Sequence, residues 1–168
     1  MTEQRLYDLA ADVGGALKAR GLALATAESC TGGWIGTAVT AVPGSSDWFE
    51  RGFITYTNVA KHEMLGVGAD ILEKYGAVSE QIVKAMVVGA LANSHAQVAV
   101  AVSGIAGPTG GTHAKPVGTV CIAWGFRGGD PVAETRLFAG DRDAVRRQSV
   151  ECALAGVLAL VTGASGIK

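Results

Sequence analysis

Ser29 has the sequence setting of a hydrolytic nucleophile. It follows a short apolar run, residues 22–26, that predicts a buried strand, and it precedes a small-residue segment that predicts a helix over about 32–42. Such a corner exposes a side chain and directs unpaired helix N–H groups toward the group that it attacks. The segment Glu28-Ser29-Cys30-Thr31-Gly32 does not match the G-x-S-x-G pattern, and a serine that only caps the helix fits the same position.

Lys61 is the candidate base for this serine. If Asn58 caps a short helix through Leu65, Lys61 lies at the third helical position, beside the positive end of the helix dipole. That placement lowers the pKa of the amine and favours a general base. The alternatives are a solvated lysine or one that pairs with Glu28 or Glu63.

Two further side chains lie close to these in the sequence. Tyr56 ends a strand predicted over 52–56 and either relays a proton or belongs to the core. Cys30 is a rival nucleophile, because a helix N-terminus activates a thiolate, although a small buried cysteine fits as well. The histidines are isolated and have no metal-ligand spacing: His62, His95 and His113.

A glycine-dense loop and a group of arginines are candidates for binding a ligand. The loop over 103–118 follows an apolar strand predicted over 97–102, as phosphate loops do, but it lacks the P-loop and dinucleotide patterns. A purely structural turn is the alternative. Its glycines include Gly104, Gly107, Gly110 and Gly111. Arg142 and Arg146 share one face of a predicted helix, with Arg147 adjacent, and either grip a phosphate or form a solvated face.

The remaining elements place these residues on an α/β framework. We expect helices over about 3–20, 58–65, 79–93 and 141–161, and two further strands over 120–126 and 132–138, joined by a tight turn. Helix and strand alternate first and a hairpin follows. This order predicts a three-layer α/β/α sandwich with a mixed, mostly parallel sheet of about five strands, in a single domain over 1–168.

Composition excludes several classes of protein. The 168 residues are 49% hydrophobic and 17% charged with a net charge of −1, which excludes a disordered chain and argues against a nucleic-acid partner. The 24 glycines follow no three-residue period, so the chain is not collagen-like. We expect no signal peptide and no membrane span. Three widely separated cysteines favour a reduced cytoplasmic protein.

Several motifs, taken in order, resemble one family over roughly residues 5 to 160. It is the nicotinamide-nucleotide amidase family, also called the CinA C-terminal domain. The motifs are Thr26-Ala27-Glu28-Ser29-Cys30-Thr31-Gly32-Gly33, Gly52-Phe53-Ile54-Thr55-Tyr56 with Asn58 and Ala60-Lys61, Gly76-Ala77-Val78-Ser79-Glu80, Ser103-Gly104-Ile105-Ala106-Gly107-Pro108, Lys115-Pro116-Val117-Gly118-Thr119-Val120 and Gly140-Asp141-Arg142.

The resemblance implies that nicotinamide mononucleotide is hydrolysed to nicotinate mononucleotide and ammonia, with Ser29 as nucleophile and Tyr56 and Lys61 as its partners. The backbone of Cys30, Thr31 and Gly32 would bind the substrate beside them. Arg146 is the preferred phosphate ligand, ahead of Arg142 and Arg147. The resemblance also implies the stand-alone form of the family, a homodimer and a reaction that needs no metal or other cofactor. A nucleotide-binding or interaction module linked to DNA uptake or repair is the alternative.

Overall fold

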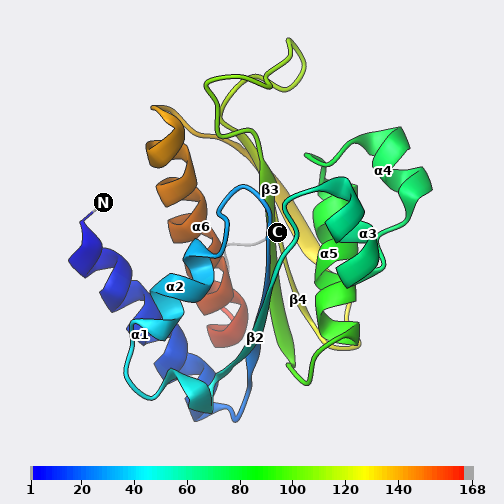
Figure 1. The fold of residues 1–168 in the computed structure, drawn as a ribbon. Helices are drawn as coiled ribbons and strands as arrows, with labels where there is room; N and C mark the ends of the chain where they lie inside the picture. Colours follow the sequence, from blue (N-terminus) through cyan, green and yellow to red (C-terminus); the bar gives the residue numbers. More distant parts are fainter. Residues whose placement is uncertain (1, 165–168) are drawn as a thin grey trace.

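A five-stranded sheet forms the centre of the molecule (Figure 1). The computed structural model describes residues 2–164. The strands in chain order are β1 (Leu24–Glu28), β2 (Phe49–Ile54), β3 (Val98–Gly104), β4 (Thr119–Phe126) and β5 (Val132–Leu137). Their spatial order is β2-β1-β3-β4-β5; β1 is parallel to β2 and β3, whereas β4 is antiparallel to β3 and β5. Four strands therefore point the same way and β4 runs against them.

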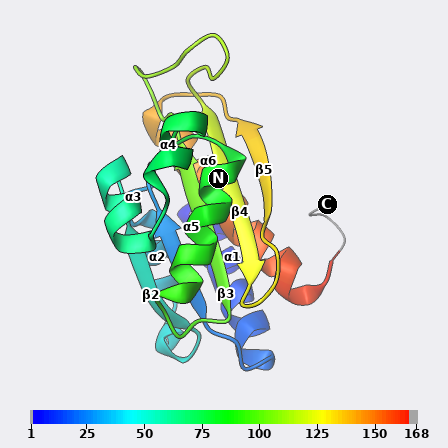
Figure 2. The same cartoon turned by 90° about the vertical axis from the view of Figure 1, so that its right-hand side faces the viewer.

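Helices cover both faces of this sheet (Figures 1 and 2). On one face lie α1 (Glu3–Ala19), α2 (Trp34–Thr40) and α6 (Arg142–Thr162); on the other α5 (Glu80–Ala92) packs on the strands, with α3 (Asn58–Leu65) and α4 (Ala69–Tyr75) beside it. A short 3-10 turn spans Ser45–Asp47. The predicted three-layer sandwich with a mixed sheet is confirmed.

The two faces of the sheet differ in side-chain size. The face toward α5 is built from alanines, whereas the opposite face carries larger buried side chains such as Leu24 and Trp124. Small side chains let a helix pack closely on the strands. The alanines are Ala25, Ala27, Ala99, Ala101 and Ala123. A helix this close brings the segment before α5 against the carboxyl ends of the parallel strands.

Side-chain caps fix where the helices begin. Ser79 and Asp141 accept hydrogen bonds from the N–H groups of Ile82 and Ala144, which confirms the predicted caps of α5 and α6. The predicted cap of α3 is wrong, because Thr57 accepts from the N–H of Ala60 and Asn58 is already helical. Lys61 consequently lies one position further along the helix than expected.

Two strands are displaced from their predicted positions. β1 starts at Leu24 rather than at Leu22, because the N–H of Leu22 donates to the carbonyl of Leu17 and closes the end of α1. β2 starts at Phe49 and ends at Ile54, so Tyr56 follows this strand rather than ending it. The short helix α4 was not predicted, because only Leu72 of its seven residues is fully buried and the pattern is too short to show a period.

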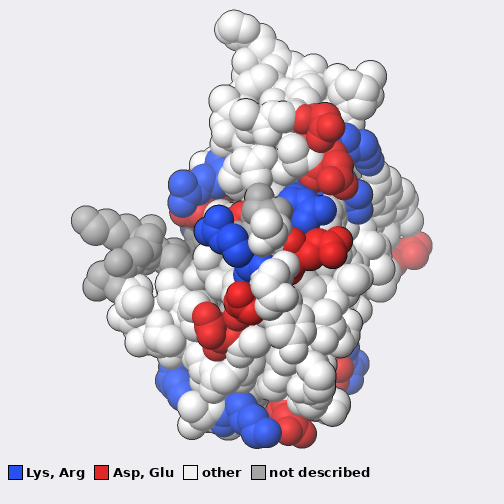
Figure 3. Space-filling view, turned by 90° about the vertical axis from the view of Figure 1, so that its left-hand side faces the viewer, with Lys and Arg blue, Asp and Glu red and all other residues white. Residues whose placement is uncertain are grey.

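Acidic and basic side chains are mixed on the face that carries α1 and α6 (Figure 3). Arg147 of α6, for example, lies 3.9 Å from the carboxylate of Asp143 one turn away. None of the helices described between residues 2 and 164 combines the length and the apolar composition that a membrane crossing requires.

Candidate active site

Ser29 lies directly beyond the carboxyl end of β1, the strand between β2 and β3. Its N–H donates to the carbonyl of Val102 at 3.0 Å, which extends the pairing of β1 with β3 by one residue. The side chain is 7% exposed, and its Oγ lies 3.0 Å from Nζ of Lys61 and 3.5 Å from the carbonyl oxygen of Tyr56. The hydroxyl is therefore held against an amine rather than used as a helix cap.

Lys61 is a buried amine with only neutral partners. The residue is 1% exposed, and Nζ lies 3.0 Å from both Ser29 Oγ and the carbonyl oxygen of Thr55. Burial lowers the pKa of Lys61, and the nearby Cys30 opposes this shift. Burial, rather than the helix dipole inferred from the sequence, thus favours the neutral amine that a general base requires.

Glu28 does not pair with Lys61, although the sequence allowed that pair. Its buried carboxylate instead accepts three hydrogen bonds at the start of α2, from Thr31 Oγ1 at 2.6 Å and from the N–H groups of Ile35 and Gly36 at 2.8 and 3.1 Å. A negative charge is stabilised at a helix N-terminus. Glu28 therefore fixes the turn that carries Ser29 and leaves the charge state of Lys61 to burial.

This turn also leaves two backbone donors beside the serine. Gly33, with φ +99°, provides the left-handed conformation that turns the chain from β1 into α2. The N–H of Gly32 donates to the carbonyl of Ser29, so it is already used. Within residues 2–164 the N–H groups of Cys30 and Thr31 form no backbone hydrogen bond, which makes them the available donors next to Ser29.

Cys30 lies beside Ser29 but is chemically unsuited to replace it. Burial raises the pKa of its thiol to about 11. The thiolate, which is the nucleophilic form, is therefore scarce at neutral pH. The structure favours the serine over its rival.

A cavity of about 260 Å³ opens above Ser29 and Lys61. It lies where β1, β2 and β3 end, the edge at which open α/β sheets bind ligands. Its walls come from the β1–α2 turn, the start of α3, the segment before α5 and the end of β3. The lining residues are Ser29, Cys30, Tyr56, Asn58, Lys61, Ala77, Val78, Ser103, Gly104, Ala106 and Arg142.

Tyr56 and Arg142 meet at the rim of this cavity. The phenol is 58% exposed, and its oxygen accepts a hydrogen bond from Arg142 Nη2 at 3.0 Å. Arg142 Nη1 donates to the carbonyl of Gly107 at 2.8 Å. The structure therefore joins the Tyr56 hydroxyl to Arg142, and it is the backbone carbonyl of Tyr56 that approaches Ser29.

The other predicted ligands lie in different places. Arg146 donates to the carbonyls of Cys30 and Thr31 at 3.0 and 3.2 Å, so its guanidinium supports the turn that carries Ser29. Of the predicted loop glycines, Gly104 lines the cavity. Gly107 supplies the carbonyl that Arg142 binds, while Gly110 and Gly111 are exposed on the part of the loop that extends away from the sheet (Figure 1).

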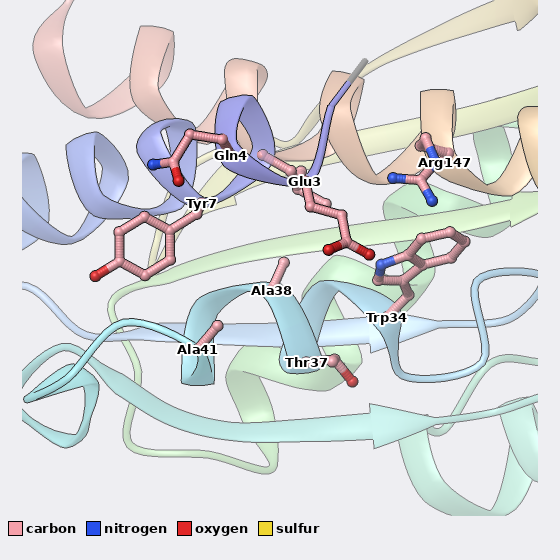
Figure 4. Close-up of a pocket in the computed structure, with 9 residues that line it drawn as sticks. Glu3, Gln4, Tyr7, Trp34, Thr37, Ala38, Ala41 and Arg147 are labelled. Carbon is pink, nitrogen blue, oxygen red and sulfur yellow. The ribbon is translucent and has the colours of Figure 1, made fainter.

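A second depression, of about 350 Å³, lies between α1 and α2 (Figure 4). Trp34 forms one wall, with the guanidinium of Arg147 5.0 Å from the centre of its ring. The remaining polar side chains of the lining are exposed and come from Glu3, Gln4, Tyr7 and Thr37. The depression is larger than the cavity above Ser29, but it contains no nucleophile in contact with a base.

One side chain in the cavity was not singled out from the sequence. Ser103, near the end of β3, lines the cavity beside Ser29. The sequence did contain a signal for it. Ser103 is the first polar residue after the apolar run of β3, and it lies at the same edge of the sheet as Ser29.

The fold and this site define an α/β/α protein with a buried serine–lysine pair at the carboxyl ends of its parallel strands. Comparison with known sequences gives the family. The CinA C-terminal domain matches residues 6–161, and the chain belongs to this family.

Named relatives and solved structures agree with this assignment. The chain is 53% identical to nicotinamide-nucleotide amidohydrolase PncC of Escherichia coli K12 over 92% of this chain and 93% of the relative. It is 54% identical to the Pseudomonas putida protein of the same name, over 92% and 96%. The crystal structure of competence/damage inducible protein CihA from Agrobacterium tumefaciens superposes with a TM-score of 0.90 at 44% identity, covering 95% of this chain and 96% of that one.

The carboxylate of Glu28 gives a testable prediction. In Glu28→Gln an amide N–H₂ would face an N–H donor of α2, so at least one buried hydrogen bond is lost. We expect the free energy of unfolding to fall by about 1–3 kcal/mol in a denaturant titration. Glu63→Gln, at an exposed position of α3, is the control. Equal stability of both variants would contradict the role given to Glu28.

Proposed function

We propose that this chain hydrolyses the carboxamide of nicotinamide mononucleotide to nicotinate mononucleotide and ammonia. The observation that carries the proposal is the contact of the buried Lys61 amine with Ser29 Oγ in a cavity. The relatives named nicotinamide-nucleotide amidohydrolase support the choice of substrate. The family signature supplies the reaction, and the site supplies residues able to perform it.

The reaction would begin with proton transfer from Ser29 to Lys61. In the structure Lys61 Nζ donates to the Thr55 carbonyl and to Ser29 Oγ, and the Ser29 hydroxyl donates to the Tyr56 carbonyl. For the reaction the hydroxyl would rotate, so that the lone pair of the neutral amine accepts its O–H. As Oγ attacks the amide carbon, its proton moves to Nζ. The carbonyl oxygen becomes an oxyanion, which the N–H groups of Cys30 and Thr31 would stabilise.

Collapse of this intermediate would release ammonia. The ammonium of Lys61 returns its proton to the leaving nitrogen, the C–N bond breaks, and the acyl group remains on Ser29 as an ester. Lys61, neutral again, then removes a proton from water, which attacks the ester and frees the carboxylate and Ser29. The cycle balances with water as the second substrate.

The phosphate of the nucleotide would bind at the cavity rim. Arg142 is the better candidate, because it lines the cavity and is exposed, whereas Arg146 already binds two backbone carbonyls. Tyr56 and the Gly107 carbonyl hold the Arg142 guanidinium in place before substrate arrives. Tyr56 thereby contributes to substrate binding through its hydroxyl.

Ammonia release from nicotinamide mononucleotide tests the proposal directly. We expect turnover of this nucleotide, and much slower turnover of free nicotinamide and of glutamine, which lack the phosphate-bearing ribose. A calorimetric titration with the same nucleotide should accompany the assay. Tight binding without ammonia release would favour a binding module over an amidase.

Substitution of Arg142 separates the two arginines. We expect Arg142→Gln to raise KM for the nucleotide by roughly 10- to 100-fold, the effect of a lost hydrogen bond to a charged group, with a smaller change in kcat. Arg146→Gln should instead lower kcat and thermal stability together, because it releases the Cys30 and Thr31 carbonyls. Arg136→Gln, on β5, is the control. The reverse pattern would assign the phosphate to Arg146.

The resemblance also implies a homodimer. Light scattering of the purified chain tests the dimer, and a single monomeric mass across the working concentration range would exclude it.

A further inference from the structure

Ser103 carries a buried hydroxyl that the proposed mechanism leaves unused. The residue is 1% exposed and lines the cavity, and within residues 2–164 its Oγ has no protein partner, so it is open to a ligand in the cavity. Other buried serines do have partners. The hydroxyl of Ser149 donates to the carbonyl of Val145 at 2.7 Å, and that of Ser79 to the carbonyl of Gly76 at 2.8 Å.

The hydroxyl of Ser103 lies at the cavity wall, at the end of a row of smaller side chains. The preceding residues of β3 on the same face are Ala99 and Ala101, so alanine fits this row of the sheet. The serine at the cavity end of the row therefore offers a hydrogen-bond donor to a ligand in the cavity.

The strand register places this hydroxyl next to the nucleophile. Glu28 pairs with Val102, so Ser29 lies beside Ser103 on the adjacent strand, and both side chains project to the α5 face, as Ala27 and Ala101 do. Adjacent strands are about 4.8 Å apart. An atom between the two residues can thus lie about 3 Å from each hydroxyl, the distance that a reacting group requires.

The two hydrogen-bond partners of Ser29 Oγ lie on the opposite side. Lys61 Nζ and the Tyr56 carbonyl come from α3 and from the segment after β2, whereas Ser103 belongs to β3. A Cβ on Gly104 would lie 3.2 Å from Cys30 Sγ, so Cys30 lies next to the end of β3. Cys30 and Ser103 both line the cavity together with Ser29.

We propose that the Ser103 hydroxyl donates a hydrogen bond to the oxygen of the substrate carboxamide and, with the Cys30 N–H, stabilises the oxyanion. This role rests on the proposed amidase function. The bond strengthens as negative charge develops on the oxygen, so it acts mainly in the transition state. Ser103 keeps its own proton throughout, and Lys61 remains the base.

The test compares Ser103→Ala with Ser149→Ala, a buried serine outside the cavity. We expect Ser103→Ala to lower kcat for nicotinamide mononucleotide about 100-fold with little change in KM, as loss of one oxyanion donor does elsewhere. Ser149→Ala should keep the kcat of the unmodified protein. Ser103→Thr, which retains the hydroxyl, should recover part of the loss. Because Ser103 Oγ has no protein partner, the melting temperature of Ser103→Ala should not fall.

The outcomes separate the two proposals. If the unmodified protein releases ammonia and Ser103→Ala matches Ser149→Ala, the role of Ser103 is overturned and the amidase function stands. A loss of kcat that accompanies a lowered melting temperature, without recovery in Ser103→Thr, would also overturn it by showing a structural role. If the unmodified protein releases no ammonia, the function itself fails.

Discussion

Ser29→Ala is expected to abolish ammonia release from nicotinamide mononucleotide. Removal of a serine nucleophile costs roughly 10⁴- to 10⁶-fold in kcat in other hydrolases, and nothing else in this cavity replaces it. The substitution removes only a hydroxyl at the surface of the cavity, so folding and substrate binding should persist. Calorimetry should accordingly give a Kd for the nucleotide close to that of the unmodified protein.

Cys30→Ala is the matched control for the serine. Because burial raises the pKa of this thiol to about 11, it is not a nucleophile at neutral pH, and the variant should retain most of the activity. Mass spectrometry of acid-quenched enzyme should show an acyl adduct on the peptide that contains Ser29. Activity that survives in Ser29→Ala and disappears in Cys30→Ala would transfer the role to the thiol.

Lys61→Met should lower the activity while the protein remains folded. Methionine has a similar length and no charge, so it fills the same buried space without an amine. We expect kcat to fall by roughly 10²- to 10⁴-fold, the contribution of a general base. Lys61→Arg should also be inactive, because arginine stays protonated. Lys84→Met, at an exposed position of α5, is the control and should remain active.

The pH dependence follows from the lowered pKa of Lys61. Only the neutral amine accepts the serine proton, so kcat should rise with pH and level off below the ordinary lysine value of about 10.4. The unfolded chain binds this proton more tightly than the folded one. Stability should therefore increase with pH between the folded and unfolded pKa values, and Lys61→Met should lose this increase. A rate that still rises through pH 10 would contradict a buried base.

Local sequence signals predicted the framework well. Caps such as Ser79 and Asp141 and the apolar runs of β1 and β3 are short-range features, so the layers and the mixed sheet follow from them. The end of β1 was predicted too early because Glu28 is charged and was interpreted as part of a polar turn after the strand. In the structure this carboxylate is buried, since the N–H groups of α2 solvate it.

The sequence indicated most of the residues that line the site, but it did not predict which of them contact one another. Motifs identified Ser29 and Lys61, but the cause of the lowered pKa is burial between elements far apart in sequence, which no local pattern reports. Arg142 and Arg146 share one helix face, and their spacing alone could not show that Arg146 is already bound to the carbonyl of Cys30. The unpaired state of Ser103 likewise depends on the sheet register.

The segment from Ile54 to Lys61 has a consequence for the order of assembly. The groups that contact Ser29 Oγ, Lys61 Nζ and the Tyr56 carbonyl, both belong to this one stretch, which joins the edge strand β2 to α3. An edge strand is paired on a single side and is the part of a sheet most ready to fray. Ser29 and Lys61 are therefore expected to be in contact only while β2 is paired with β1. Turnover measured in mild denaturant would then report on this pairing, whereas circular dichroism reports on the helices of the whole molecule.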